Sequence, residues 1–235
     1  MLVSGWKKII RILRFCWRCL IILLVLDAGY LWGMMPEWDY YAQGPLIKSA
    51  FIRDYEYRRL QDTSLPALQW QPVPLQAISP NLMRAVLVAE DSRFFQHNGI
   101  DTDALRSAME YNLAKQKLVY GGSTISQQLT KNLFLTPSRN PLRKWHELWL
   151  TLALEHALSK QRILELYLNV AEFGQGLYGA EAAAEYYWNC PAGQLSMAQS
   201  IALAATLTSP VKHNPHTRTD YFRSQQMKIR SNMGL

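Results

Sequence analysis

The sequence predicts a mainly α-helical protein. Apolar residues recur at helical spacing in several segments, as Leu82, Ala85, Val86 and Ala89 do. Helix-capping residues precede these segments, and prolines and glycines separate them. The chain has 235 residues, which is enough for one globular domain with a hydrophobic core behind an N-terminal anchor.

The net charge of +7 is unevenly distributed. Five basic residues and one acidic residue precede residue 36, so the rest of the chain carries only +3. This modest charge does not indicate a nucleic-acid-binding protein. Cys16 and Cys19 form a Cys-x-x-Cys pair inside an apolar run, and we interpret the pair as incidental rather than as a redox or metal site. Cys190 is the third cysteine, so no disulfide framework is expected.

Residues 1–35 predict a cytoplasmic tip followed by a transmembrane anchor. Residues 19–35 are apolar apart from Asp27, close to the roughly 17–25 residues that a membrane-spanning helix needs. All five basic residues precede this run, so we expect the N-terminus in the cytoplasm and the rest of the chain across the membrane. A cleaved signal peptide is the alternative, but residues 27–30 make a poor cleavage site.

Residues 36–71 predict an extended connector, because prolines at positions 36, 45 and 66 interrupt the chain. Ile52–Leu60 is expected to form a short strand or helix within it. The globular part then runs from residue 72 to residue 235.

The first stretch of interest begins with a predicted helix from Ser79-Pro80 to Glu90 and Asp91. Carboxylates are unfavourable at the C-terminal end of a helix, where the helix dipole favours cations. Aromatic residues, His97 and an Asn-Gly turn follow directly. The stretch therefore predicts a site around Glu90, and the alternative is an ordinary acidic pair on the surface.

A second stretch follows Gly121-Gly122. Thr124 and Gln127 have the spacing of a capping box, which predicts a helix start. Gln128, Lys131 and Asn132 then fall on the first turns of that helix, which suits an anionic ligand. The alternative is an ordinary capped helix with a polar face.

Further helices are expected on either side of this stretch. They are Leu105–Leu118, a helix from Arg143 to Leu158, Lys160–Asn169, Ala180–Trp188 and a last helix from Ser196 to Leu207, with a glycine-rich loop at 174–179.

Residues 135–145 mix basic and apolar side chains, which predicts either contact with lipid headgroups or a solvated loop. His146-Glu147 lacks the second histidine of a zinc protease motif. His213 and His216 are interpreted as surface residues.

Two carboxylates, Glu90 and Glu147, thus stand on separate elements, with the cations Lys131, Arg139 and Arg143 between them in the sequence. One carboxylate can remove a proton from an attacking hydroxyl. The cations can stabilise the charge of a departing phosphate. This combination suits transfer of a glycosyl group from a phosphate-type leaving group.

Five motifs in order make the sequence resemble the peptidoglycan glycosyltransferases of glycosyltransferase family 51, in their monofunctional form. The motifs are Glu90–Gly99, Gly121–Gln128, Arg143–Glu147, Lys160–Asn169 and Gly179–Ala183, within residues 72–215. One departure is Ser126, where the family often has threonine.

The resemblance implies a lysozyme-like, two-lobed glycosyltransferase domain, with a head and a smaller membrane-proximal jaw that contains Leu133–Trp145. It implies polymerisation of lipid II into β-1,4 glycan strands. Glu90 would be the general base that deprotonates the acceptor 4-hydroxyl, which attacks with inversion. Undecaprenyl pyrophosphate would leave, helped by Lys131 and Arg139, with Mg²⁺ or Mn²⁺ as the one cofactor left open.

The resemblance gives supporting roles to other residues. Glu147 would be the second essential acid, on the donor side, and His97 would order the loop around Glu90. The residues expected to shape the substrate cleft are Thr124, Gln128, Asn132 and Arg143. No residue is assigned to a metal.

The expected partners are lipid II, the growing glycan strand, the membrane and proteins of cell division or wall synthesis, and not nucleic acid. The expected location is the bacterial inner membrane, as a single-pass protein whose catalytic domain is periplasmic. No transpeptidase activity is expected, since the chain has no Lys-Thr-Gly motif. The alternatives are a lysozyme-like or lytic glycan-cleaving enzyme and a non-catalytic scaffold for wall synthesis.

Overall fold

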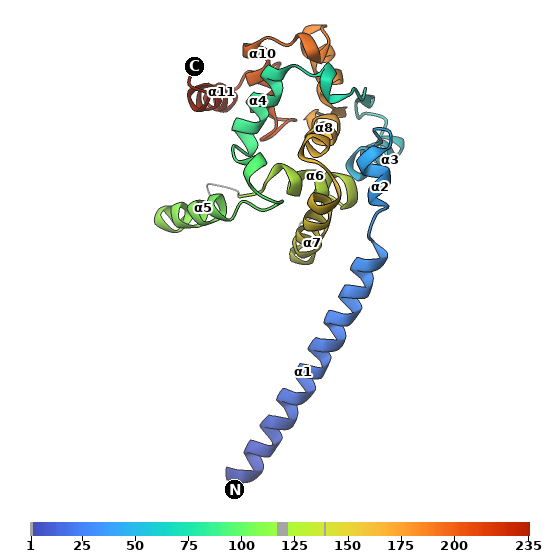
Figure 1. Cartoon of the computed structure of the whole chain (residues 1–235), viewed down its shortest axis with the longest axis vertical. Coiled ribbons are helices and arrows are strands. Elements are labelled where there is room, and N and C mark those ends of the chain that lie inside the picture. Colours follow the sequence, from blue (N-terminus) through green and yellow to red (C-terminus); the bar gives the residue numbers. More distant parts are fainter. Residues whose placement is uncertain (1, 117–121, 139) are drawn as a thin grey trace. The chain divides into compact units, whose positions relative to one another are not determined.

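The computed structural model describes residues 2–116, 122–138 and 140–235. The chain divides into two compact units, Met1–Glu37 and Trp38–Leu235. The first unit is built on one helix, α1 (Leu2–Gly33) (Figure 1). Its apolar side chains from Leu20 to Leu26 are exposed.

Among the described residues, no helix has both the length and the hydropathy required to cross a membrane. The predicted transmembrane anchor therefore stays a prediction.

The second unit is mainly helical, as the sequence predicts. Its helices are α2 (Trp38–Gln43), α3 (Ala50–Gln61), α4 (Pro80–Glu90), α5 (Thr102–Lys115), α6 (Ile125–Phe134), α7 (Pro141–Ala157), α8 (Lys160–Val170), α9 (Ala180–Trp188), α10 (Met197–Thr206) and α11 (Asp220–Asn232). Three short 3₁₀ turns join them: η1 (Leu75–Ala77), η2 (Phe94–Gln96) and η3 (Ala192–Gln194).

Capping chemistry defines where the helices begin. The Ser79 hydroxyl accepts a hydrogen bond from the backbone of Asn81, and Pro80 occupies the first turn of α4. Both predicted capping boxes are present, at Thr124 on α6 and at Ser196 on α10. These starts are confirmed because the signals for them are local in the sequence.

The segment around 52–60, for which the sequence predicts a strand or a helix, is a helix, α3, whose N-cap is Ser49. Two elements differ from the sequence prediction. The predicted glycine loop contains strands β2 (Glu172–Gly174) and β3 (Leu177–Tyr178). The helix that ends near Leu207 is not the last one, because α11 follows with Thr219 as its N-cap. The predicted end of Leu105–Leu118 lies outside the described residues, and α5 is described to Lys115.

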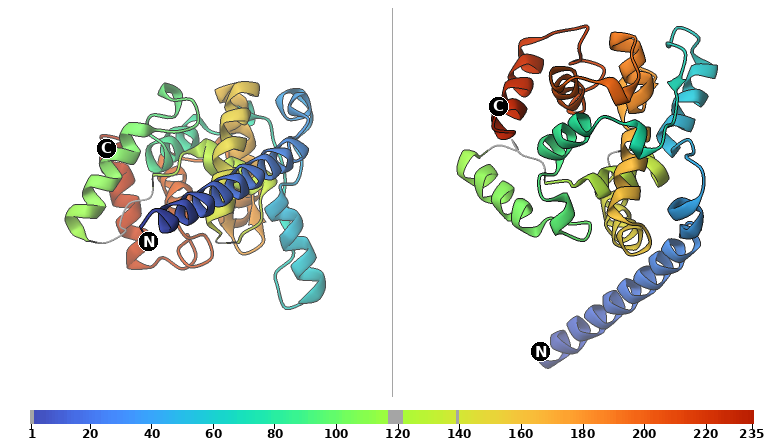
Figure 2. Two further views of the ribbon diagram at one scale, coloured as in Figure 1. Left: turned by 90° about the horizontal axis from the view of Figure 1, so that it is seen from below. Right: turned by 45° about the horizontal axis from the view of Figure 1, so that its top comes forward.

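The hydrophobic core places α4 and α6 so that their polar ends face one another. Helix α10 packs against α4 and α11, and α6 packs against α3, α7 and α8. Leu82 and Val86 of α4 and Ile125 and Leu129 of α6 are fully buried in one core cluster. Helix α5 contributes no buried residue and projects from the rest of the unit (Figure 2).

A small sheet completes the unit. Its strand order is β1-β3-β2, where β1 (Gln69–Trp70) is parallel to β3, and β2 is antiparallel to β3. The turn between β2 and β3 needs a glycine, because Gly176 has φ +73° and a Cβ there would lie 2.5 Å from the Tyr55 hydroxyl. The hairpin is thereby packed directly on α3.

Side chains of helix α8 form hydrogen bonds with the segments that precede α4. The Arg162 guanidinium donates to the backbone carbonyls of Tyr41 at 2.8 Å and Gly44 at 2.5 Å. The Asn169 side chain both donates to and accepts from the backbone of Val73. The predicted connector is therefore packed against the helical unit over part of its length.

Candidate active site

Glu90 lies at the C-terminal end of α4, where the sequence predicts it. The Gln128 side-chain amide, on the second turn of α6, donates a 2.6 Å hydrogen bond to the Glu90 carboxylate. The Tyr167 hydroxyl of α8 in turn donates to the Gln128 carbonyl oxygen at 3.0 Å. These two hydrogen bonds fix the orientation of the Gln128 amide and thus of the Glu90 carboxylate.

The pKa of Glu90 is raised above the ordinary value of a glutamate, and burial is the main cause. The hydrogen bond from Gln128 and the positive charge of Lys131 oppose this rise, and the Asp91 charge adds to it. Glu90 is thus a stronger base than an exposed glutamate, which is the property that a proton acceptor needs.

Lys131 lies on α6, one turn beyond Gln128. Its pKa is lowered, first by burial and then by the charges of Arg143 and Lys144, while Glu147 and Glu90 raise it. Both carboxylates therefore stabilise the charged form of the same ammonium group. Among the described residues, no carboxylate forms an ion pair with Lys131 within 4.0 Å, so this half-buried ammonium group is suited to an incoming anion.

Glu147 is buried on α7 and is paired with two cations from the same helix. Arg143 Nη1 lies 2.8 Å from one carboxylate oxygen, and Lys144 Nζ binds the other. The Arg143 Nε atom also donates to the Ser138 carbonyl at 2.6 Å, which orients the guanidinium. Glu147 thus holds two cations in place on the face of α7 that is packed toward α6.

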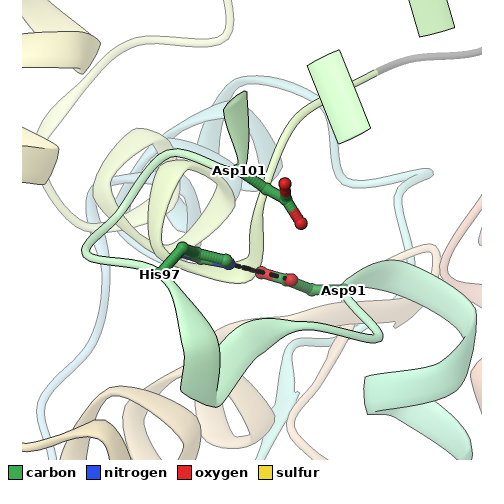
Figure 3. Close-up of side chains that lie close together, drawn as sticks. All are labelled: Asp91, His97 and Asp101. Atoms are coloured by element: carbon green, nitrogen blue, oxygen red, sulfur yellow. Dashed lines mark hydrogen bonds and ion pairs between the residues drawn. The ribbon is translucent and has the colours of Figure 1, made fainter. Parts of the chain in front are cut away.

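Asp91 connects the loop after Glu90 to the start of α6. Its carboxylate lies 3.0 Å from His97 Nε2 (Figure 3). It also accepts a 3.0 Å hydrogen bond from the backbone of Ile125. Both Asp91 and His97 are buried. One carboxylate therefore ties the end of α4, the loop and the first turn of α6 together, which keeps Gln128 next to Glu90.

Asp91, His97 and Asp101 each have a potential metal-ligand atom, and these atoms lie within 4.8 Å of one another. However, the Asp91 oxygens are engaged as described above. Asp101 caps α5 through the backbone of Ala104 and lies 3.4 Å from Arg93 Nε. A divalent cation would have to displace these bonds beside a guanidinium charge, so this cluster does not fit the Mg²⁺ or Mn²⁺ that the family resemblance left open.

The structure brings together most of the predicted site residues. Thr124 is buried and contributes indirectly: it caps α6, and its hydroxyl donates to the Gly99 carbonyl at 2.6 Å. Asn132 lines the same cavity as Gln128 and Lys131. Arg139 lies outside the described residues, so its predicted contact with a leaving group stays a prediction.

The sequence prediction gave no role to three residues of this arrangement. Lys144 pairs with Glu147. Asp91 ties the loop after Glu90 to α6, and Tyr167 orients the Gln128 side chain. Lys144 stands three residues before Glu147 on one helix, so its helical spacing was a usable signal. No local signal connects Tyr167 to Gln128, 39 positions away.

The fold and the site together define a class of protein. A carboxylate with a raised pKa can accept a proton from a hydroxyl, and a lysine and two further cations beside it can stabilise an anionic group. A mainly helical domain with this arrangement is suited to group transfer between a hydroxyl acceptor and an anionic donor.

Comparison with known proteins identifies the particular family. Residues 59–234 match the family model described as Transglycosylase. The chain is 38% identical over 223 residues to the biosynthetic peptidoglycan transglycosylase of Nitrosospira multiformis, which covers 94% of this chain and 96% of that protein. It is 44% identical over 211 residues to the protein of the same name from Bordetella avium, covering 88% of each. The chain belongs to the transglycosylase family.

Proposed function

We propose that this protein polymerises lipid II into β-1,4 glycan strands of peptidoglycan, as a transferase without transpeptidase activity. The names of its relatives support the substrate class, and the carboxylates and cations of the site support the type of reaction. The acceptor is the 4-hydroxyl of a lipid-linked sugar, and the donor is the growing strand on its undecaprenyl pyrophosphate. The domain is proposed to have the two-lobed, lysozyme-like form, with Leu133–Trp145 in the jaw.

In this reaction the Glu90 carboxylate takes the proton of the acceptor hydroxyl as its oxygen attacks the anomeric carbon of the donor. The new glycosidic bond forms as the bond to the pyrophosphate breaks, with inversion at that carbon. The pyrophosphate leaves with the electron pair, and Lys131 stabilises its negative charge. Arg143 and Lys144, held by Glu147, add positive potential on the donor side.

One observation carries the proposal: Glu90 is held by a neutral amide, while Lys131 lies between Glu90 and Glu147 without being committed to either. A glycan-cleaving enzyme has no anionic leaving group and no use for this concentration of cations. A scaffold would have no use for a carboxylate with a raised pKa.

The test is polymerisation of purified lipid II by the purified protein. Wild-type protein is expected to produce glycan strands and release undecaprenyl pyrophosphate, whereas Glu90→Gln gives neither while its thermal unfolding is unchanged. A phosphoglycolipid inhibitor of the moenomycin type is expected to block the wild-type reaction. Release of fragments from finished glycan without strand synthesis would instead support the cleaving alternative.

We also propose that the N-terminal segment holds the protein at the bacterial inner membrane, in a single pass with the N-terminus in the cytoplasm and the catalytic domain in the periplasm. The support is the exposed apolar run Leu20–Leu26 of α1 and the basic residues that precede it. On α7, Leu142, Trp145 and Trp149 are exposed, which suits contact with lipid headgroups. Proteins of wall synthesis or division are the proposed partners at the membrane.

Cell fractionation tests this location. The protein is expected to stay with the membrane through an alkaline carbonate wash, and protease added to spheroplasts is expected to digest its catalytic domain. Deletion of residues 1–35 is expected to release the protein. Release of the intact protein by the carbonate wash would contradict the proposed anchor.

A further inference from the structure

A cavity of about 170 Å³ lies beside the site, on the side of α6 that carries Gln128 and Lys131. Tyr167 of α8 and Phe51 of α3 form part of its wall, and the β2–β3 hairpin closes it with Glu172 and Tyr178. An amide, an ammonium group, a carboxylate and aromatic rings thus surround one small space. Aromatic and apolar walls with a few convergent polar groups are typical of a small-molecule site.

Glu172 is a prominent charged group of this cavity that the proposed reaction does not use. It begins β2 and lies opposite Tyr178 in the register of the hairpin. The Gly176 backbone N–H and the Tyr178 hydroxyl lie on its side of the hairpin and favour its ionised form. Because Gly176 is packed against Tyr55, the hairpin holds this carboxylate in a fixed position.

In the part of the chain that the structure describes, no cation lies close enough to balance the charge of Glu172. Among the described residues, no lysine or arginine nitrogen forms an ion pair with it within 4.0 Å. Arg58 of α3 acts on it only at longer range, and the Arg58 Nε atom is 2.9 Å from Asp54. A fixed carboxylate at a cavity wall retains lone pairs that can accept hydrogen bonds from a ligand.

We propose that Glu172 is a specificity-determining residue that accepts hydrogen bonds from the hydroxyl or amide N–H groups of the N-acetylated amino sugar of the acceptor. This inference rests on the proposed function, because the acceptor hydroxyl must lie at Glu90. The Gln128 side chain contacts Glu90 and also lines the cavity, so a sugar whose hydroxyl reaches Glu90 has its neighbouring groups next to this space. Glu172 acts on binding of the acceptor and not on the proton transfer.

The protonation of Glu172 provides a distinctive readout. Burial raises the pKa of Glu172 to about 7. The charged and titratable groups around it are Arg58 and Tyr55 of α3, Tyr178 of β3, Lys131 of α6 and Tyr167 of α8. Arg58 favours the ionised carboxylate, and the tyrosines titrate far above neutral pH. Burial lowers the pKa of Lys131 below its ordinary value, so comparison with Glu172→Gln is what assigns a pH dependence near neutral pH to the carboxylate.

The sign of the pH dependence follows from this pKa. Ionised Glu172 accepts ligand hydrogen bonds more strongly than the neutral acid does. The ionised fraction rises about tenfold between pH 6 and pH 8 for a group with a pKa near 7. The KM of the wild-type enzyme for lipid II is therefore expected to fall about five- to tenfold over that range.

The test compares Glu172→Gln with the matched control Glu185→Gln, which replaces an exposed glutamate on α9. Steady-state polymerisation of lipid II is measured at pH 6, 7 and 8. Glu172→Gln is expected to raise KM about five- to tenfold at pH 8, to leave kcat within about threefold of wild type and to remove the pH dependence of KM. Glu185→Gln is expected to match the wild type. Tyr178→Phe removes a hydroxyl that favours the ionised carboxylate, and it is expected to change KM in the same direction by a smaller factor.

A direct binding measurement separates this inference from the proposed function. Binding of the N-acetylglucosamine disaccharide is measured by calorimetry on Glu90→Gln protein, with and without Glu172→Gln. Weaker binding in the double variant supports the inference even if the wild type polymerises nothing. Equal KM values, equal pH profiles or equal disaccharide binding with and without Glu172 would overturn it.

Discussion

Glu90 and Glu147 are the same residue type in two opposite environments. Glu90 stands at a helix end, held by the neutral amide of Gln128, and burial raises its pKa. Glu147 stands inside a helix, paired with Arg143 and Lys144. The first environment favours uptake of a proton, and the second uses a fixed negative charge to orient cations. Environment, and not residue identity, therefore separates the proposed base from the group that orients the cations.

The strongest test of this difference is Glu90→Gln. The amide keeps the shape of the side chain but cannot take a proton, so kcat is expected to fall by about 10²–10⁴-fold. Because the glutamine remains next to Gln128, thermal unfolding is expected to stay within a few degrees of the wild type. Strand synthesis by Glu90→Gln within tenfold of the wild-type rate would remove Glu90 from the role of base.

Glu147→Gln is expected to have the second largest effect. The carboxylate is buried, but Lys144 is about half exposed (49%), so the lost ion pairs are expected to cost only about 1–2 kcal/mol of stability. Loss of the Glu147 charge also lowers the pKa of Lys131 further, because Glu147 now raises it. The alkaline limb of the pH–rate profile is expected to move to lower pH, and kcat at pH 7 to fall about tenfold or more. An unchanged alkaline limb would show that Lys131 and Glu147 are not coupled.

Asp91→Ala tests how the Glu90 region is supported. The substitution removes the acceptor for His97 and for the Ile125 backbone, leaving two buried polar groups without this partner. An unsatisfied buried hydrogen-bonding group costs about 1–3 kcal/mol, so a clear drop in the unfolding temperature is expected. Activity is expected to fall about tenfold, because the end of α4, the following loop and the first turn of α6 are no longer tied together. Asp103→Ala, at an exposed aspartate of α5, is the control and is expected to keep full activity.

Gln128→Ala is expected to have the smallest effect and the clearest sign. The amide stabilises ionised Glu90, so its removal raises the pKa of Glu90 further. Activity requires the ionised form, and the acid limb of the pH–rate profile is therefore expected to move to higher pH. Activity is expected to recover as the pH rises above this limb. A limb that moves to lower pH would contradict the assigned hydrogen bond.

The sequence predicted those parts of the structure whose causes are local. Ser79-Pro80 and the two capping boxes mark helix starts within four residues, and the structure has them at these positions. The β2–β3 hairpin was missed because its glycines indicate a loop, whereas its strands are stabilised by pairing with Gln69 and Trp70, about a hundred positions away. Helix α11 was missed because its apolar residues are sparse.

The site shows the same limit. Glu90, Lys131 and Glu147 were predicted from their types and from a family resemblance, but the contacts among them depend on packing. The hydrogen bond from Gln128 to Glu90 spans 38 positions, and the one from Tyr167 to Gln128 spans 39. Glu172 was not singled out, because a carboxylate next to a glycine-rich loop is expected to be solvated. Its place in the cavity depends on the hairpin, which the sequence did not predict.

The bonds from Arg162 to the segment before α3 also bear on how the chain folds as it is made. Arg162 donates to the Gly44 carbonyl, 118 positions earlier, and to the Tyr41 carbonyl, 121 positions earlier. During synthesis, residues 41–44 emerge long before α8 does, so they must wait for the later helix before these bonds can form. Contacts of such long sequence separation form late and slow folding. The segment next to α1 is therefore expected to be among the last to become ordered.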